Sequence, residues 1–269
     1  MRLPLPPGVA LADHDAVDVG AGRPHLTPCT RGGVLAIVKR LPRRLVDEPQ
    51  AVVALEREGN VIAALDGRGA PRLLDRGRDG YGPYLVVEVA RGRPLAALGR
   101  AEALAAAVGV VDALAAVHEA RDARGPLAIV HGDPSPANVI VAESGSARWI
   151  DFGLAGLRDA PLERSGRARG TLRLLAPEVA RGEAATAASD VFAAALSIVE
   201  ALLGRPARAA TTAAAAIVLA AEEPIPLALV REAAPEPLAS ALASALAEAP
   251  ERRPSAAELA RLARAAGPP

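Results

Sequence analysis

Residues 129–140 of this 269-residue chain read Ile-Val-His-Gly-Asp-Pro-Ser-Pro-Ala-Asn-Val-Ile. Apolar residues at both ends bracket a loop in which Asp133 and Asn138 lie five residues apart, so both side chains can converge on one site. Thirteen residues after Asn138, the run Trp-Ile-Asp-Phe-Gly at 149–153 adds Asp151. Carboxylate and amide oxygens are hard ligands that suit Mg²⁺ at a nucleotide phosphate, and Asp133 is left as a base for a hydroxyl proton.

A single lysine stands upstream of this loop. The chain has 31 basic residues, of which Lys39 is the one lysine and thirty are arginine. Because an ammonium is a compact point charge and a guanidinium is not, this lysine is a candidate for chemistry that arginine cannot perform. It ends the apolar run 34–38, which predicts a buried strand. Residues 47–49 then predict a helix with acids in its first turn and with helical spacing of Val52, Leu55, Glu58, Ile62 and Leu65.

The order of the remaining patterns predicts two lobes. A strand-rich first third is followed by a helical remainder, which indicates two unequal lobes joined near residues 88–93. From Pro177 onward the pattern is helical, in segments separated by prolines. Between these parts we expect a strand at 84–89, a long Ala-rich helix at 101–120, and short strands at 127–130, 139–141 and 149–150.

Composition excludes several classes of function. A formal net charge of zero argues against a protein that binds nucleic acid or an anionic membrane through bulk charge. One cysteine, Cys29, cannot form an internal disulfide or a zinc cluster. Prolines interrupt the first seven residues, which argues against a signal peptide, and the longest membrane candidate, 209–221, is too short to span. We therefore expect a soluble, cytoplasmic protein with no membrane span and no nucleic-acid partner.

Taken together, the motifs resemble those of the eukaryotic-like (Hanks-type) protein Ser/Thr kinases. The signatures of that family are a Gly-rich loop, a strand lysine, H-R-D-L-x-x-x-N, D-F-G and A-P-E, and this chain has counterparts in the same order. The resemblance implies an α+β, two-lobed protein-kinase-like fold with a small β-rich N-lobe and a larger helical C-lobe. It further implies one kinase domain over 1–269, with the N-lobe at about 10–88, the hinge at about 88–93 and the C-lobe at about 94–265.

The resemblance also implies roles for individual residues. Lys39 corresponds to the lysine that neutralises the α/β-phosphates of ATP, Glu58 to its ion-pair partner, and Asp133 to the catalytic base. Asn138 and Asp151 correspond to the Mg²⁺ ligands. The other matches are Gly20 and Gly22 of the Gly-rich loop, the hinge residues Glu88, Val89 and Ala90 that meet adenine, Asp190 that holds the catalytic loop, and the Glu178–Arg253 pair.

Four residues depart from the family pattern. His25 stands where a third glycine is expected, Ile37 where an alanine roofs the adenine, and Ser135 where a lysine meets the γ-phosphate. Gly132 replaces the arginine that pairs with a phosphorylated activation loop, which predicts activity independent of that phosphorylation. We expect transfer of the γ-phosphate of ATP to Ser/Thr hydroxyls of protein substrates. The alternatives are a small-molecule kinase resembling aminoglycoside phosphotransferases, favoured by Gly132, and a non-catalytic pseudokinase binding module.

Overall fold

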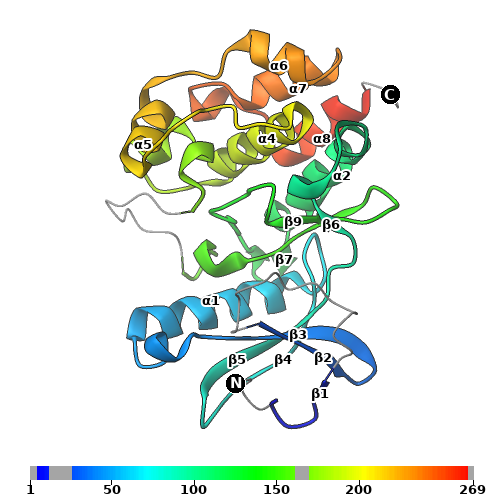
Figure 1. The fold of residues 1–269 in the computed structure, drawn as a ribbon, viewed down its shortest axis with the longest axis vertical. Helices are drawn as coiled ribbons and strands as arrows, with labels where there is room; N and C mark the ends of the chain where they lie inside the picture. The colour runs from blue at the N-terminus through cyan, green and yellow to red at the C-terminus, as the bar shows by residue number, and fades with distance from the viewer. Residues whose placement is uncertain (1–4, 12–25, 161–169, 266–269) are drawn as a thin grey trace.

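A computed structural model describes residues 5–11, 26–160 and 170–265 and shows an α+β fold of two lobes (Figure 1). A five-stranded sheet and one long helix form the smaller lobe, at the bottom of the view. Helices from the second half of the chain form most of the larger lobe above it. The predicted fold class is therefore confirmed.

The sheet of the smaller lobe is antiparallel and places Lys39 on one defined face. Its order is β1-β2-β3-β5-β4, so the strand with Lys39 lies in the middle. In β3, Leu35, Ile37 and Lys39 alternate with the buried Ala36 and Val38, which pack on the opposite face. The strand bounds are Ala10–Leu11 for β1, Leu26–Arg31 for β2, Val34–Arg40 for β3, Leu73–Asp79 for β4 and Gly82–Glu88 for β5.

Helix α1 (Pro49–Leu65) carries Glu58 against this sheet. Glu48 precedes the helix and Pro49 is its first residue, so the predicted start is confirmed, but the expected acids lie just before the first turn and not within it. Gly59 explains how closely α1 approaches β5, since a Cβ at this position would meet a side-chain methyl of Leu85 at 2.7 Å. The sequence thus selects glycine next to the functional acid to bring the helix near the strand.

The larger lobe is built around two apolar helices. Helix α2 (Arg100–His118) corresponds to the predicted Ala-rich helix, and α4 (Ala187–Leu203) is buried along most of its length. Both pack into one core with Trp149 and Phe152. The predicted helical region after Pro177 is confirmed, with α3 at Pro177–Ala180, α5 at Ala213–Glu222, α6 at Leu227–Ala233, α7 at Leu238–Ala245 and α8 at Ala256–Ala265.

The short strands of the larger lobe differ in part from expectation. The predicted strand at 127–130 is wrong, because only Val130 forms an isolated bridge, to Gly156. Ala128 has a φ of 49°, which interrupts extended backbone. The chain instead forms a small hairpin just upstream, of β7 (Arg121–Asp122) and β8 (Gly125–Pro126).

A three-stranded sheet gathers the segments that surround the site. Its order is β10-β9-β6, with bounds Ala147–Trp149, Val139–Val141 and Arg93–Pro94. The predicted strand at 139–141 is confirmed, and the one expected at 149–150 begins and ends earlier. The backbone N–H of Ile150 still donates to the carbonyl of Asn138 at 2.8 Å. The hinge side, the catalytic loop and Asp151 are therefore joined by backbone pairing.

One helix within the described residues, α2, is long and apolar enough to cross a membrane by length and composition. Half of that stretch is buried inside the larger lobe, as expected for a core helix of a folded domain. Residues 209–221, the longest membrane candidate in the sequence, include most of α5. This helix meets the length and composition criteria for a membrane span only together with α6, and the two are bent by 105°.

Candidate active site

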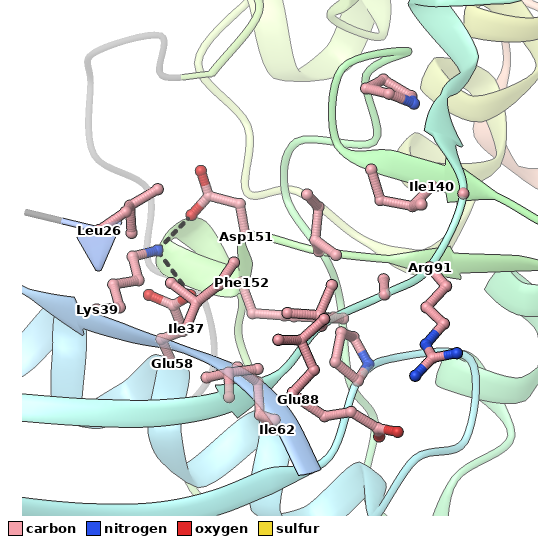
Figure 2. Close-up of a pocket in the computed structure, with 18 of the residues that line it drawn as sticks. Leu26, Ile37, Lys39, Glu58, Ile62, Glu88, Arg91, Ile140, Asp151 and Phe152 are labelled. Atoms are coloured by element: carbon pink, nitrogen blue, oxygen red, sulfur yellow. Dashed lines mark hydrogen bonds and ion pairs between the residues drawn. The ribbon is translucent and has the colours of Figure 1, made fainter. Parts of the chain in front are cut away.

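Lys39 lies between two carboxylates that come from distant parts of the chain. Its Nζ is 2.7 Å from Oε1 of Glu58 on α1 and 2.9 Å from Oδ1 of Asp151, and Figure 2 shows both contacts. Glu58 is almost fully buried, whereas half of the Asp151 side chain is exposed. Glu58 thus lies where the resemblance implies, whereas Glu56, two residues earlier in the same helix, is exposed. The arrangement presents one ammonium and one open carboxylate to a cleft.

The electrostatics keep this lysine charged. Burial by itself would lower the pKa of Lys39, but the Glu58 and Asp151 carboxylates outweigh it and raise the pKa above the ordinary value. Burial favours the neutral form of Asp151 as well, yet the neighbouring ammonium lowers the pKa of this carboxyl. Lys39 and Asp151 are therefore both ionised at neutral pH, as phosphate and metal binding require.

Two residues hold the carboxylate of Asp133: Asn138 in the catalytic loop and Thr171 further along the chain. Nδ2 of Asn138 donates to Oδ2 of Asp133 and to its backbone carbonyl, each at 3.1 Å. The backbone N–H of Thr171 donates to Oδ1 at 2.9 Å. Gly170 makes this approach possible, because its φ is 80° and a Cβ there would lie 2.9 Å from Oδ1 of Asp133. The local sequence gives no signal of this contact, because every residue other than proline carries a backbone N–H.

Asp190, near the start of α4, holds the backbone of the catalytic loop, as the resemblance implies. Its carboxylate accepts the backbone N–H groups of His131 at 2.6 Å and Gly132 at 2.9 Å. Nε2 of His118 lies 3.0 Å from the same carboxylate. The side chain of Asp190 is 1% exposed, so these bonds are shielded from water. Asp190 is therefore also a buried partner of His118.

A cavity of about 680 Å³ extends from Lys39 to the hinge. Leu26 and Ile37 from the smaller lobe and Ile140 and Ile150 from the larger lobe line this cavity, which makes part of it an apolar slot. Figure 2 labels Leu26, Ile37 and Ile140. Ile37 lies at the position that, by the resemblance, covers one face of the adenine. A flat aromatic base with a polar edge matches such a slot.

The hinge borders this slot with residues that the resemblance implies. Glu88, Val89 and Ala90 line the cavity. The N–H of Val89 donates to the carbonyl of Leu35 at 3.0 Å and is thus not available to a ligand. Within the described residues, no hydrogen bond engages the N–H of Ala90. The Glu88 side chain accepts bonds from Arg72, so the hinge contribution of Glu88 is limited to its backbone.

The side-chain oxygens of Asn138 and Asp151 are of the kind that Mg²⁺ prefers. Because Nδ2 of Asn138 is committed to Asp133, its Oδ1 remains as a donor, and Oδ2 of Asp151 makes no ion pair among the described residues. Nowhere in 5–11, 26–160 or 170–265 do three or more His, Cys, Asp or Glu side chains gather as a metal site of their own. One carboxylate and one amide oxygen suit a hard cation whose other ligands are phosphate oxygens and water.

Comparison with known families places the chain. Residues 30–262 match the family described as "Protein kinase domain". The chain belongs to the protein kinase domain family. The matched region includes the Lys39 centre, the catalytic loop, the hinge and the helical lobe described above.

Three curated relatives of this kinase domain are bacterial. The chain is 28% identical to the "Probable serine/threonine-protein kinase PknB" of Bifidobacterium longum, over 70% of this chain and 29% of the relative. It is 29% identical to "Serine/threonine-protein kinase PknA" of Mycobacterium tuberculosis, over 65% of this chain and 42% of the relative. Identity to "Serine/threonine-protein kinase PkaA" of Streptomyces coelicolor is 33%, over 85% and 42% respectively. The chain therefore spans less than half the length of these relatives.

The kinase domain also contains the expected ion pair beneath its substrate side. Arg253 donates to both oxygens of Glu178, through Nη1 at 2.6 Å and Nη2 at 2.8 Å. The Arg253 guanidinium stacks over the ring of Phe192, with its carbon 4.9 Å from the ring centroid. This pair fastens the A-P-E segment to α4.

Some expectations fall outside what the structure describes. The Gly-rich loop residues Gly20 and Gly22, together with His25, lie outside the described residues. Ser165, which stands between the Asp-Phe-Gly and Ala-Pro-Glu runs, also lies outside them. Their roles remain predictions from the sequence.

Gly132 lies in the left-handed region, close to the backbone of Leu154. Its φ is 81°, and a Cβ at this position would lie 2.4 Å from the backbone carbonyl oxygen of Leu154. Leu154 directly follows the Asp-Phe-Gly run, so the catalytic loop and that run approach each other closely at this glycine. The substitution thus changes the local packing of the loop in addition to removing a charge.

We expect Gly132→Ala to destabilise the domain by about 2 kcal/mol or more, because the left-handed backbone and the backbone clash both oppose a Cβ. Gly182→Ala is the matched control, since Gly182 has a φ of 90° but open space around it. Denaturant unfolding of the two variants measures the difference. Equal losses of stability in the two variants would show that the contact with Leu154 carries no energy.

His131 gives the domain a pH-dependent stability. Its side chain is fully buried against Trp149 and Phe152, and this burial lowers its pKa despite the nearby carboxylates of Asp190, Asp133 and Asp151. The folded state therefore keeps the imidazole neutral at a pH where the unfolded chain already protonates it. The free energy of unfolding falls as the pH drops through about 6.5 and toward the folded-state pKa.

We expect His131→Phe to flatten this dependence. One proton contributes a slope of at most about 1.4 kcal/mol per pH unit, and the variant should lack that contribution while keeping a ring in the core. Urea unfolding at several pH values between about 7 and 5 measures both slopes. Because only the slopes are compared, a uniform loss of stability in the variant does not affect the conclusion. Parallel curves would contradict the prediction.

Proposed function

We propose that this chain catalyses the ATP- and Mg²⁺-dependent transfer of a γ-phosphate to Ser/Thr hydroxyls of protein substrates. The observation that carries the proposal is the position of Lys39, whose Nζ contacts Glu58 at 2.7 Å and Asp151 at 2.9 Å. A binding module has no need for a buried acid that holds an ammonium beside an open carboxylate. The printed names of the three relatives, all serine/threonine-protein kinases, support the same activity.

The residues divide the chemistry among themselves. Lys39 offers a point charge to the phosphates of ATP, and the apolar slot and the Ala90 N–H receive the adenine. Asp133 accepts the proton of the attacking hydroxyl, and its hydrogen bonds to Asn138 and Thr171 hold the carboxylate in one orientation. Bound Mg²⁺, held by Asn138 and Asp151, would supply positive charge to the phosphate oxygens. The protein thus contributes mainly position and electrostatic stabilisation.

The Glu178–Arg253 pair favours a protein substrate over a small molecule. It anchors the segment that follows Thr171, next to the base, and such a fixed segment is suited to receive an extended peptide. Gly132 favours the small-molecule alternative, and Ser135, His25 and Ile37 favour a pseudokinase. We also propose a cytoplasmic location, since ATP is the phosphoryl donor and the buried Cys29 is a free thiol.

Incubation of the purified protein with γ-labelled ATP and Mg²⁺ tests the proposal. One arm contains the protein alone, a second contains generic protein substrates, and a third contains a panel of small hydroxyl compounds. Transfer to serine or threonine in proteins is the expected result. Transfer confined to small molecules would replace this proposal by the second alternative, and nucleotide binding without transfer would favour the pseudokinase.

A further inference from the structure

A short segment connects the catalytic base to the substrate side of the larger lobe. Thr171 donates its N–H to Asp133, and the next residues form the turn η5 (Leu172–Leu174) before Ala176 and Pro177 begin α3. We call residues 171–176 the acceptor segment. Because a peptide hydroxyl must reach Asp133, its neighbouring residues must lie along this segment.

Arg208, from the loop after α4, holds the backbone of the acceptor segment. Its Nη1 donates to the carbonyl of Arg173 at 3.1 Å and to the carbonyl of Leu175 at 2.8 Å. Arg208 is 6% exposed, and its guanidinium carbon lies 5.5 Å from the ring centroid of Phe192. Phe192 thus has Arg208 and Arg253 as cationic neighbours. Arg253 binds the carboxylate of Glu178, and Arg208 binds the backbone of the acceptor segment.

Glu200 on α4 holds the same segment through a side chain. Its carboxylate accepts both contacts of the Arg173 Nε, at 3.2 and 3.0 Å, and the N–H of Ala207 at 3.0 Å. Ala207 immediately precedes Arg208. One acid therefore ties the acceptor segment and the loop of Arg208 together, and it is itself 5% exposed.

The guanidinium of Arg208 is expensive to bury, which points to a positional role. Two of its nitrogens, Nε and Nη2, are buried without a hydrogen-bond partner. Burial lowers the pKa of Arg208 to about 10, against the raising effect of Glu200 and Glu223, so the side chain stays charged at neutral pH. Unpaired buried donors cost stability, and an apolar side chain would avoid this cost. The feature that an apolar residue would not reproduce is the pair of bonds to Arg173 and Leu175.

We propose that Arg208 is a positioning residue for the acceptor side of the site. Through the carbonyls of Arg173 and Leu175 it holds the acceptor segment in the conformation that sets the Thr171 N–H on Asp133. This inference rests on the proposed function for its kinetic consequence, whereas its structural consequence stands without it.

The substitution Arg208→Met removes the donors and keeps a long apolar stem. We expect KM for a protein or peptide substrate to rise about tenfold, the scale of one lost charged hydrogen bond, with KM for ATP unchanged. The matched control is Arg205→Met, three residues earlier in the same loop, because Arg205 is exposed and pairs with Glu232, away from the acceptor segment. Arg208→Lys retains a charged donor and should recover part of the loss.

Amide hydrogen exchange of residues 170–176 provides a readout that does not need catalysis. Exchange should quicken in Arg208→Met, stay at the wild-type rate in Arg205→Met, and quicken less in Arg208→Lys than in Arg208→Met. If the wild-type protein shows no transfer activity but Arg208→Met still exchanges faster than the wild type, the positioning role stands and only the proposed function is overturned. Wild-type exchange in folded Arg208→Met, or equal rises in KM for both substrates, would overturn the positioning role. If Arg208→Met does not fold, Arg208→Lys takes its place: a smaller but measurable rise in exchange and in KM for the protein substrate, absent in Arg205→Met, supports the positioning role, and no rise in either overturns it.

Discussion

Replacing Asp133 by asparagine is expected to lower the rate of phosphoryl transfer by about 10²–10⁴-fold, the contribution of a positioned general base. An amide has nearly the shape of the carboxylate but does not accept the hydroxyl proton. Its oxygen can still accept the Thr171 N–H, and Asn138 can still donate to the backbone carbonyl of residue 133, although the second side-chain bond from Asn138 is lost. The loop should therefore largely keep its conformation. The affinity for ATP should change little, because Asp133 is not among the residues that line the nucleotide cavity.

Steady-state transfer and nucleotide binding measured on the same preparation check this result. Asp66→Asn is the matched control, since Asp66 caps the end of α1 in a left-handed conformation that asparagine tolerates, far from the base. Full activity in Asp133→Asn would remove this residue from the role of base. Loss of ATP binding in the same variant would instead indicate a collapsed loop.

The second large effect is expected from a substitution that keeps the charge. Lys39→Arg should lower transfer about 100-fold, although arginine is the residue that this chain uses at thirty other positions. Nζ of Lys39 fits between Glu58 and Asp151 at 2.7 and 2.9 Å, and a planar guanidinium on a longer side chain cannot centre its charge in that space. Misplacement of a catalytic group by about 1 Å is sufficient for a loss of this size.

Transfer rate and ATP affinity should be measured together for Lys39→Arg. The reverse exchange at an exposed position, Arg44→Lys, is the control and should leave both unchanged. A fully active Lys39→Arg would show that only the sign of the charge matters at this position. A variant that neither binds ATP nor retains the melting temperature would attribute the loss to packing of the smaller lobe.

Much of the site was open to prediction because its motifs are local. The loop at 129–140 and the run at 149–153 carry Asp133, Asn138 and Asp151 within 19 residues of one another. The Lys39–Asp151 contact joins residues 112 positions apart, and the sequence indicated it only through the order of the motifs. Long helices such as α2 and α4 were also predictable, since tertiary packing agrees with the local pattern there.

What escaped prediction depends on backbone conformation and on contacts between distant segments. The apolar run 127–130 reads as a strand, but the positive φ of Ala128 interrupts it. Gly132 reads as the loss of a family arginine, and only the structure shows that a Cβ at this position would lie 2.4 Å from the carbonyl oxygen of Leu154. Arg208 has no signal in the sequence at all, because its partners lie 33 and 35 residues earlier and are carbonyls, which every residue possesses.

The solitary lysine has a consequence for labelling the protein in solution. A reagent or an acetylating enzyme that acts on lysine side chains meets only one of them in this chain, Lys39. While Lys39 is paired with Glu58 and Asp151, its raised pKa keeps the nitrogen protonated and unreactive. The rate of amine labelling at Lys39 therefore reports how often α1 moves away from the sheet, and the chain carries this reporter without any engineering.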